Sequence, residues 1–214
     1  MSSSSTDCDN IQVRENMPVL LAMGGNLPSA VGTPLDTQVA ALECLLKAGV
    51  EVEAVSCLYR TSPVPVSDQP DFINCALRVR THLAPQALLD VCQETEVALG
   101  RQKGERWSAR TLDIDVLAYG DRVLPDEQAW RDVTCNPDPA YILDQAVVPH
   151  PRLHLRGFVL MPLNDIAPEW RHPVLGTTVR EMLTKLPASD RAGIERMAVD
   201  FGRFSTLQPG RGAV

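Results

Sequence analysis

Several features that mark other protein classes are absent from this sequence of 214 residues. No apolar run approaches the ~18–20 residues that a membrane-spanning helix needs. The formal net charge is −7, whereas a surface that binds nucleic acid is normally basic. There is also no G-x-x-x-x-G-K-[ST] motif, the glycine-rich sequence of a P-loop. These absences argue against a membrane protein, a general nucleic-acid-binding protein and a P-loop enzyme.

The six cysteines include no C-x-x-C pair, the spacing of many zinc sites. Several lie in apolar periodic segments, where a free cysteine behaves as a small hydrophobic residue. His150 and His154 have an i, i+4 spacing, but Pro151 argues against a single helix that presents both rings to a metal. Residues 1–16 are rich in serine and lack the apolar core of a secretory signal, so we expect a disordered tail. We therefore expect a reduced, cytoplasmic protein without a zinc site.

The most informative stretch is residues 106–117, in which Asp113 and Asp115 alternate with aliphatic residues. This period of two predicts a half-buried strand, in which residues two apart point to the same face. The two Cα atoms would lie roughly 6.5–7 Å apart. At that separation both carboxylates can share a pair of metal ions about 3.5–4 Å apart. Mg²⁺ is the natural candidate, because it binds one or two carboxylates together with substrate phosphates.

The simpler interpretation of this D-x-D pattern is the solvated face of an antiparallel sheet, which is the commoner origin of such a match. However, Arg106, Trp107 and Arg110 lie directly before the carboxylates, and a solvated face does not need them. The two arginines would supply positive charge to phosphates, so their presence favours a phosphate site.

Hydrophobic periodicity elsewhere predicts the element order β-α-β-β-α-β. This is the order of a ferredoxin-like α+β sandwich, with an antiparallel sheet, helices on one face and the other face available for a site. On one strand, Phe72 and Asn74 share the face opposite the apolar one. The expected strands are residues 18–23, 50–61, 72–81 and 112–117, and the expected helices are residues 34–49 and 85–99.

Three further segments interrupt or follow this unit. Residues 125–146 carry no sustained period, and we expect an inserted loop there. Thr178 and Glu181 form a capping-box pattern, which predicts a last helix that ends near Leu186. Residues 187–214 carry only weak signals and form a C-terminal extension, so the expected domain is residues 17–186.

Short motifs follow one another in order through residues 18–186. They include Gly24-x-Asn26, Ser56-x-x-Tyr59-x-Thr61-x-Pro63, Gln69-x-x-Phe72-x-Asn74, Arg106-Trp107-x-x-Arg110-Thr111-Leu112-Asp113-Ile114-Asp115, Pro149-His150-Pro151 and Arg156-Gly157-Phe158. Together they resemble the motifs of the 6-hydroxymethyl-7,8-dihydropterin pyrophosphokinase family. So many ordered matches do not arise by chance.

The resemblance implies transfer of pyrophosphate from ATP to the hydroxymethyl group of the pterin, leaving AMP, as a step of folate biosynthesis. It implies ATP as co-substrate and two Mg²⁺ ions held by Asp113 and Asp115, with Arg101 and Arg110 completing the catalytic group at the phosphates. Matching positions imply further site residues, which are Gln93, Glu96, Lys103, Arg106, Trp107, His150 and Arg156 for ATP, and Thr61, Pro63, Val64, Phe72, Asn74 and Phe158 for the pterin.

The chain departs from the family pattern at a few positions. Ser108-Ala109 replaces the usual Gly-Pro, and Lys103 stands where arginine is common, although lysine does not replace arginine at a bidentate site. The alternative is a non-catalytic ferredoxin-like module that binds a nucleotide or RNA, but RNA binding requires exposed aromatic residues and a basic surface. We expect a monomer whose partners are ATP and the pterin, with neither nucleic acid nor a membrane.

Overall fold

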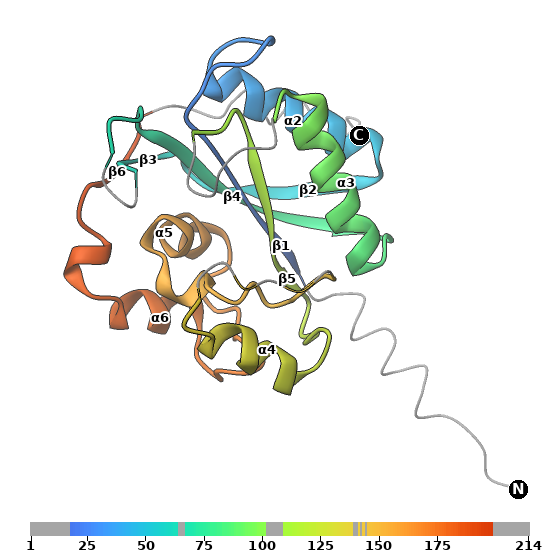
Figure 1. Cartoon of the computed structure of the whole chain (residues 1–214), viewed down its shortest axis with the longest axis vertical. Helices are drawn as coiled ribbons and strands as arrows, with labels where there is room; N and C mark the ends of the chain where they lie inside the picture. Colours follow the sequence, from blue (N-terminus) through green and yellow to red (C-terminus); the bar gives the residue numbers. More distant parts are fainter. Residues whose placement is uncertain are drawn as a thin grey trace, which may run out of the picture.

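The centre of the fold is a six-stranded sheet, in a computed structural model that describes residues 18–63, 67–101, 109–138, 141, 143 and 145–198. The strands run in the order β5-β1-β4-β3-β6, and β2 also pairs with β4. All the pairings are antiparallel, and β1 and β4 lie side by side (Figure 1). This arrangement confirms the predicted ferredoxin-like α+β class. The strands are β1 (Val19–Gly25), β2 (Val50–Val55), β3 (Tyr59–Thr61), β4 (Phe72–Thr81), β5 (Asp113–Tyr119) and β6 (Ile194–Arg196).

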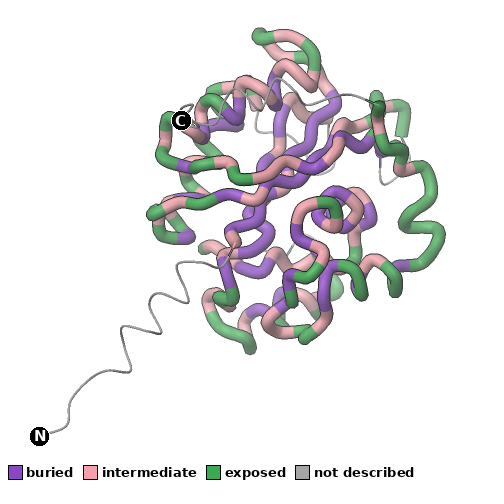
Figure 2. The backbone as a smooth tube through the Cα atoms, turned by 180° about the vertical axis from the view of Figure 1, so that it is seen from behind, coloured by how far each residue is buried: buried purple, intermediate pink, exposed green. Residues whose placement is uncertain are grey.

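Helices α2 (Pro34–Lys47) and α3 (Pro85–Ala98) cover one face of the sheet (Figure 1). Helix α2 begins at the predicted residue, because Thr33 and Asp36 form a capping box at its start. Alternate strand residues, such as Leu21 and Leu77, point into this layer and are fully buried. Burying one leucine side chain contributes about 1.5–3 kcal/mol. This layer is the main hydrophobic core, and Figure 2 shows the strands beside it as the buried centre of the molecule.

The opposite face of the sheet is covered in part, by segments that follow β5. Helix α5 (Gly157–Ile166) packs on β4, and helix α6 (Val179–Lys185) packs against α5. A second apolar cluster joins Leu20 and Leu117 of the sheet to Leu160 of α5. The predicted capping box at Thr178 and Glu181 is confirmed as the start of α6. The additions after β5 therefore leave only a part of this face free for a site.

The prediction of one continuous strand over residues 50–61 is wrong, because the chain forms β2 and β3 with a break between them. Ser56 causes the break. Its hydroxyl accepts the N–H of Ala76 at 2.9 Å, in the place of a backbone carbonyl of a regular ladder. The next N–H, of Cys57, donates to the Asp165 carboxylate at 3.1 Å and leaves the sheet. A side chain that replaces a ladder acceptor cannot be recognised from the alternation of apolar residues.

The prediction of a loop over residues 125–146 is also wrong in part, because this segment contains helix α4 (Glu127–Cys135). Asp126 caps the helix, and its carboxylate accepts the N–H of Ala129 at 2.8 Å. Within its 9 residues the buried ones are Trp130 and Val133. Its apolar residues Ala129, Trp130 and Val133 have helical spacing, but 9 residues are fewer than the roughly 11–18 over which such a period is recognised.

The C-terminal extension contributes β6, which adds to the sheet beside β3, with Ile194 opposite Thr61. The same segment crosses the start of α5. There Gly157 has no side chain, which leaves room for the backbone of Asp190. The longest described helices, α2 and α3, have 14 residues each, and none of the described helices could span a membrane.

Candidate functional site

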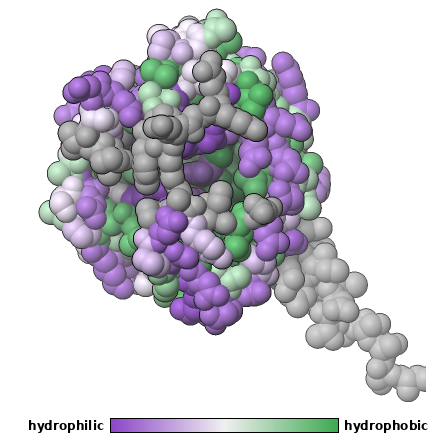
Figure 3. Space-filling view, viewed as in Figure 1, coloured by the Kyte–Doolittle hydropathy of each residue, from purple (hydrophilic) through white to green (hydrophobic). Residues whose placement is uncertain are grey.

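A cavity of about 640 Å³ lies between the ends of β1, β4 and β5 and the start of α5, mainly on the partly covered face of the sheet, and Leu89 and Gln93 of α3 also line it. Figure 3 shows that the molecule is hollowed on one side, with both hydrophilic and hydrophobic atoms visible inside the hollow. The cavity exists because α5 covers only one stretch of the sheet face.

The cavity brings together most of the residues that the sequence singles out. Of the 17 candidate residues, Val64, Lys103, Arg106 and Trp107 lie outside the described residues, which leaves 13. Glu96 is not among the residues that line the cavity. The other 12 line it: Thr61, Pro63, Phe72, Asn74, Gln93, Arg101, Arg110, Asp113, Asp115, His150, Arg156 and Phe158.

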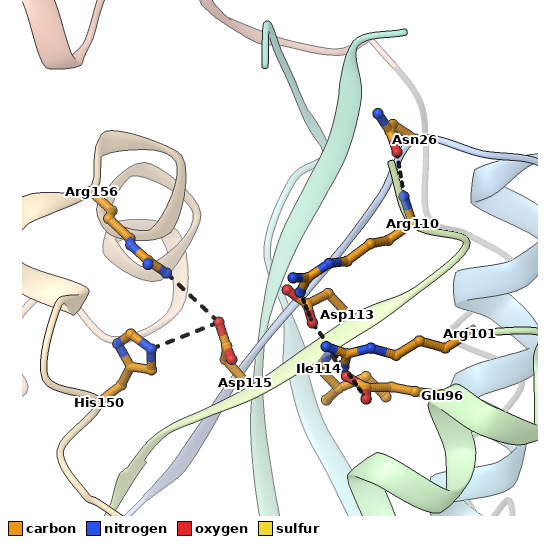
Figure 4. Close-up of polar contacts among 9 residues, drawn as sticks. All are labelled: Asn26, Glu96, Arg101, Arg110, Asp113, Ile114, Asp115, His150 and Arg156. Atoms are coloured by element: carbon orange, nitrogen blue, oxygen red, sulfur yellow. Dashed lines mark hydrogen bonds and ion pairs between the residues drawn. The ribbon is translucent and has the colours of Figure 1, made fainter. Parts of the chain in front are cut away.

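Asp113 and Asp115 project from β5 into the cavity, while Ile114 between them points into the main core. Arg110 Nη1 lies 2.7 Å and Arg101 Nη1 3.0 Å from Asp113 Oδ1 (Figure 4). Burial and the nearby Asp115 raise the pKa of Asp113, although both arginines oppose this shift. Arg101 and Arg110 therefore hold Asp113, and their positive charge offsets the repulsion from Asp115.

The Asp115 carboxylate faces the other wall of the cavity. His150 Nε2 and Arg156 Nη1 each lie 4.0 Å from Asp115 Oδ2 (Figure 4). Burial is the largest cause that lowers the pKa of His150, so the ring is neutral at pH 7. Its Nδ1 accepts the N–H of Arg152 at 3.1 Å, so the ring proton is on Nε2, toward the cavity. His150 is thus a neutral donor beside Asp115.

Glu96 lies beneath the carboxylate pair, where it holds β5 and Arg101 in place. Its carboxylate accepts the N–H of Ile114 at 2.6 Å and forms an ion pair with Arg101 (Figure 4). Ile114 belongs to β5, a strand at the end of the sheet order, so its N–H needs a partner from outside the sheet. Burial raises the pKa of Glu96 to about 7. The structure thus places Glu96 as a positioning residue behind the cavity wall.

Asn26 is a supporting residue that the sequence analysis did not assign to the site. Its side-chain oxygen accepts the N–H of Arg110 at 2.8 Å, and its own N–H donates to the Arg110 carbonyl at 2.9 Å. Asn26 therefore fixes the backbone from which the Arg110 guanidinium reaches Asp113. The sequence analysis noted Asn26 only within the motif Gly24-x-Asn26, as part of the resemblance to the family, and gave it no role.

The far end of the cavity combines an amide with aromatic rings. Asn74 donates to the Thr61 hydroxyl at 2.8 Å, and Gly24 on β1 leaves the space that the Asn74 amide fills. Phe72 and Phe158 also line this end. An amide offers both a donor and an acceptor, and aromatic faces stack on flat rings. This end is suited to a flat, polar heterocycle.

The segment between α4 and His150 supplies cavity walls that were missed entirely. Val133 of α4, and Leu143, Gln145 and Val147, line the cavity next to His150. Their contribution depends on contacts between α4 and the chain that follows it. No local pattern in the sequence indicates them.

The donor set at Asp113 and Asp115 fits Mg²⁺, which takes oxygen ligands and rarely more than two carboxylates from the protein. Within the described residues no group of three or more histidine, cysteine, aspartate or glutamate side chains could hold a metal ion. An ion held by two carboxylates has further coordination positions, which oxygen atoms of a ligand can fill. A phosphate-rich ligand supplies such oxygen atoms.

Comparison with known proteins gives a consistent result. Residues 20–168 match the family model described as 7,8-dihydro-6-hydroxymethylpterin-pyrophosphokinase. A 2-amino-4-hydroxy-6-hydroxymethyldihydropteridine pyrophosphokinase of Methylorubrum extorquens is 42% identical over 149 residues, which cover 70% of this chain and 80% of the relative. The Pseudomonas aeruginosa protein of the same name is 36% identical over 180 residues, 84% of this chain and 96% of the relative.

A solved structure of similar fold is Plasmodium falciparum HPPK-DHPS, wild type with pteroate, at a TM-score of 0.61 and 16% identity. The match covers 86% of this chain and 48% of that chain, so this protein spans about half its length. At this identity the likeness concerns the fold alone. The family model and the bacterial relatives carry the assignment: the chain belongs to the 7,8-dihydro-6-hydroxymethylpterin-pyrophosphokinase family.

Proposed function

We propose that this protein transfers the pyrophosphoryl group of ATP to the hydroxymethyl group of 6-hydroxymethyl-7,8-dihydropterin, giving the pterin diphosphate and AMP in folate biosynthesis. One observation carries the proposal. A single cavity joins a carboxylate and arginine cluster to an end lined by an amide and two phenylalanines. The first suits a triphosphate with Mg²⁺, and the second suits a pterin. The alternative of a non-catalytic nucleotide- or RNA-binding module has no support among the matched proteins.

In the proposed reaction, the hydroxymethyl oxygen attacks the β-phosphorus of ATP. A new P–O bond forms there, the bond from the β-phosphorus to the bridging α–β oxygen breaks, and AMP leaves while the hydroxyl proton is released. Such transfers depend mainly on alignment and on stabilisation of phosphate charge. The protein therefore needs to hold two substrates in line and surround the phosphates with positive charge.

Arg101 and Arg110 are the residues that we assign to the phosphates. Both guanidinium groups already lie within 3.0 Å of Asp113, at the edge of the cavity. A bound phosphate would share these donors, because one guanidinium has five N–H groups. Glu96 and Asn26 keep the two arginines aimed at the same point.

Asp113 and Asp115 are the residues that we assign to two Mg²⁺ ions, with ATP as co-substrate. When bound, Mg²⁺ neutralises phosphate charge and orients the phosphates for displacement. The two carboxylates leave room for ligand oxygens, as the donor set requires. Gln93, His150 and Arg156 complete the nucleotide side, and the neutral His150 offers its Nε2 proton.

At the pterin end, we assign Asn74 to the amide-like edge of the pterin and Phe72 and Phe158 to its two faces. The Arg156 guanidinium lies 5.6 Å from the centre of the Phe158 ring. Phe158 is thus next to a residue that we assign to the nucleotide. Thr61 and Pro63 close the end of the pocket.

We further propose a monomer in the cytoplasm. The cysteines within the described residues are all free, which suits a reducing compartment. A cavity within a single chain joins both proposed ends of the site, which is compatible with a monomer.

The direct test is to incubate the protein with ATP, Mg²⁺ and 6-hydroxymethyl-7,8-dihydropterin, and to identify the nucleotide product. We expect AMP, formed only when the pterin is present. Formation of ADP, or of AMP at the same rate without the pterin, would contradict the proposed function.

A further inference from the structure

Trp130 is buried in helix α4, a part of the chain that the proposed function does not use. Its indole N–H donates to the carbonyl of Pro149 at 2.7 Å. The two residues are 19 positions apart in the chain, so this bond ties α4 to the segment that enters the site. A buried hydrogen bond of this kind has one geometry, because the indole ring cannot rotate within packed surroundings.

The carbonyl of Pro149 directly precedes His150, whose ring faces the cavity. Three bonds hold His150 itself. Its N–H donates to the Leu117 carbonyl at 2.8 Å, its carbonyl accepts the Leu153 N–H at 3.1 Å, and its Nδ1 accepts the Arg152 N–H at 3.1 Å. The bond from Trp130 adds a constraint on the residue directly before it. With these bonds in place, Nε2 lies 4.0 Å from Asp115 Oδ2.

The position of Trp130 is itself fixed by aromatic neighbours. The centre of its ring system lies 5.0 Å from the His172 ring and 6.3 Å from the His154 ring. One turn along α4, Val133 is nearly fully buried and lines the cavity beside His150. Helix α4 therefore reaches the cavity through Val133 directly, through Trp130 by way of Pro149, and through a longer bond of 3.5 Å from the Thr134 hydroxyl to the Pro151 carbonyl.

We propose that Trp130 is a positioning residue, which fixes the His150 ring and the adjoining wall at the nucleotide end of the cavity. The assignment of that end to the nucleotide rests on the proposed function. Loss of the indole N–H lets the Pro149 carbonyl shift, and His150 then faces Asp115 less often. Trp130 touches no substrate in this proposal and acts only through its neighbours.

Trp170 provides a matched control. Its ring is also buried, lies 5.7 Å from the same His172, and donates its indole N–H to a backbone carbonyl, that of Gly120, at 3.2 Å. Gly120 does not line the cavity. Trp130→Phe and Trp170→Phe therefore each remove one buried indole hydrogen bond from one aromatic cluster, but only the first bond leads to His150.

The first experiment measures the dissociation constants of a non-hydrolysable ATP analogue with Mg²⁺, and of the pterin, by calorimetry. Loss of one hydrogen bond corresponds to about a 3- to 10-fold change, which we expect in the affinity of Trp130→Phe for the analogue. The pterin affinity of this variant, and both affinities of Trp170→Phe, should stay within about 2-fold of wild type. Equal weakening of analogue binding in the two variants, or none in Trp130→Phe, would overturn the proposal.

The second experiment combines Trp130→Phe with His150→Ala. If Trp130 acts through His150, Trp130→Phe should weaken analogue binding no further in the His150→Ala background. Additive losses would mean that Trp130 acts by another route. Should Trp130→Phe fail to fold, benzothienylalanine at position 130 keeps the ring shape without the N–H and replaces it in both experiments.

An NMR measurement separates this proposal from the proposed function. The Hε1 signal of His150 should shift or broaden in Trp130→Phe and remain in place in Trp170→Phe, without any ligand. An unchanged His150 signal in Trp130→Phe would refute the positioning role, whatever the substrate. A wild-type protein that forms no AMP, but shows this pattern, would instead overturn only the proposed function.

Discussion

On the α2–α3 side of the sheet, Leu21 and Leu77 are fully buried in a continuous apolar layer, whereas on the other side Asn74, Asp113 and Asp115 face a cavity. The same strands supply both sets, because successive residues of a strand point to opposite faces. Two helices cover most of one side of the sheet, whereas α5 and the segments around it cover only a part of the other. The site therefore lies where helices leave the sheet uncovered. Alternate residues of the same strands contribute to the hydrophobic core and to the candidate site.

The largest effect is expected on the open side, from Asp115→Asn. Loss of a charge that stabilises the transition state costs about 3–4 kcal/mol, or ~10²–10³ in rate. We expect turnover to fall by that factor, while the circular dichroism spectrum and the unfolding midpoint remain close to wild type. Near-normal turnover at saturating Mg²⁺ would show that Asp115 has no part in catalysis.

Leu77→Ala tests the sealed side of the same sheet. Removal of a fully buried leucine side chain should lower the free energy of unfolding by about 3 kcal/mol. Because Leu77 points away from the cavity, turnover of the folded variant should stay within about 2-fold of wild type. Urea denaturation and turnover at a temperature where the variant is folded measure the two quantities. A loss of turnover without a loss of stability would contradict the view that this face of the sheet contributes to stability and not to catalysis.

Phe158→Ala tests the boundary between the two sides, because Phe158 lines the cavity and also packs against the second apolar cluster. Loss of a stacking face and of its buried area should weaken pterin binding by about 2 kcal/mol, roughly 30-fold in Kd. Binding of ATP should change much less. Leu183→Ala removes apolar packing from the same cluster without lining the cavity, and it should leave both affinities unchanged. Equal losses for both ligands in Phe158→Ala would assign Phe158 to the fold alone.

The smallest effect concerns His172, which is fully buried and packs beside Trp130. Burial lowers the pKa of His172 from 6.5 to about 4. The unfolded chain therefore takes up a proton below pH 6.5 that the folded protein rejects, so stability is full above pH 6.5 and falls as the pH drops toward 4. The loss between pH 7.5 and 5.5 from this group should be about 1.4 kcal/mol.

His172→Asn is the variant that isolates this effect. The His172 Nδ1 accepts the N–H groups of Val174 and Leu175 at 3.2 Å each, and an asparagine oxygen can accept the same bonds. Denaturation curves at the two pH values should therefore show a smaller pH-dependent loss in His172→Asn than in wild type. The same pH dependence in both proteins would mean that His172 does not control acid stability.

The sheet and the open face could be predicted from the sequence because their signals are local. Alternation on β4 and β5 separates Asn74 and Asp113 from their apolar neighbours, and a capping box marks the start of α2. The same reasoning did not identify α4, in which Trp130 donates its indole N–H to Pro149, a residue 19 positions away in the chain. It also could not show that Glu96 accepts the Ile114 N–H rather than facing the cavity. Such roles depend on contacts between distant segments, and the hydrophobic periodicity of the sequence does not reveal these contacts.

One consequence of β6 concerns how molecules of this protein meet one another in concentrated solution. Among the described strands, β6 is the outermost at its end of the sheet, and Glu195 and Arg196 are both exposed. A strand from another molecule that approached this edge would find only 3 residues to pair with, two of them charged. Short, charged edges of this kind discourage edge-to-edge pairing between sheets. The C-terminal segment thus covers the outer edge of β3, which would otherwise be the last strand at this end of the sheet.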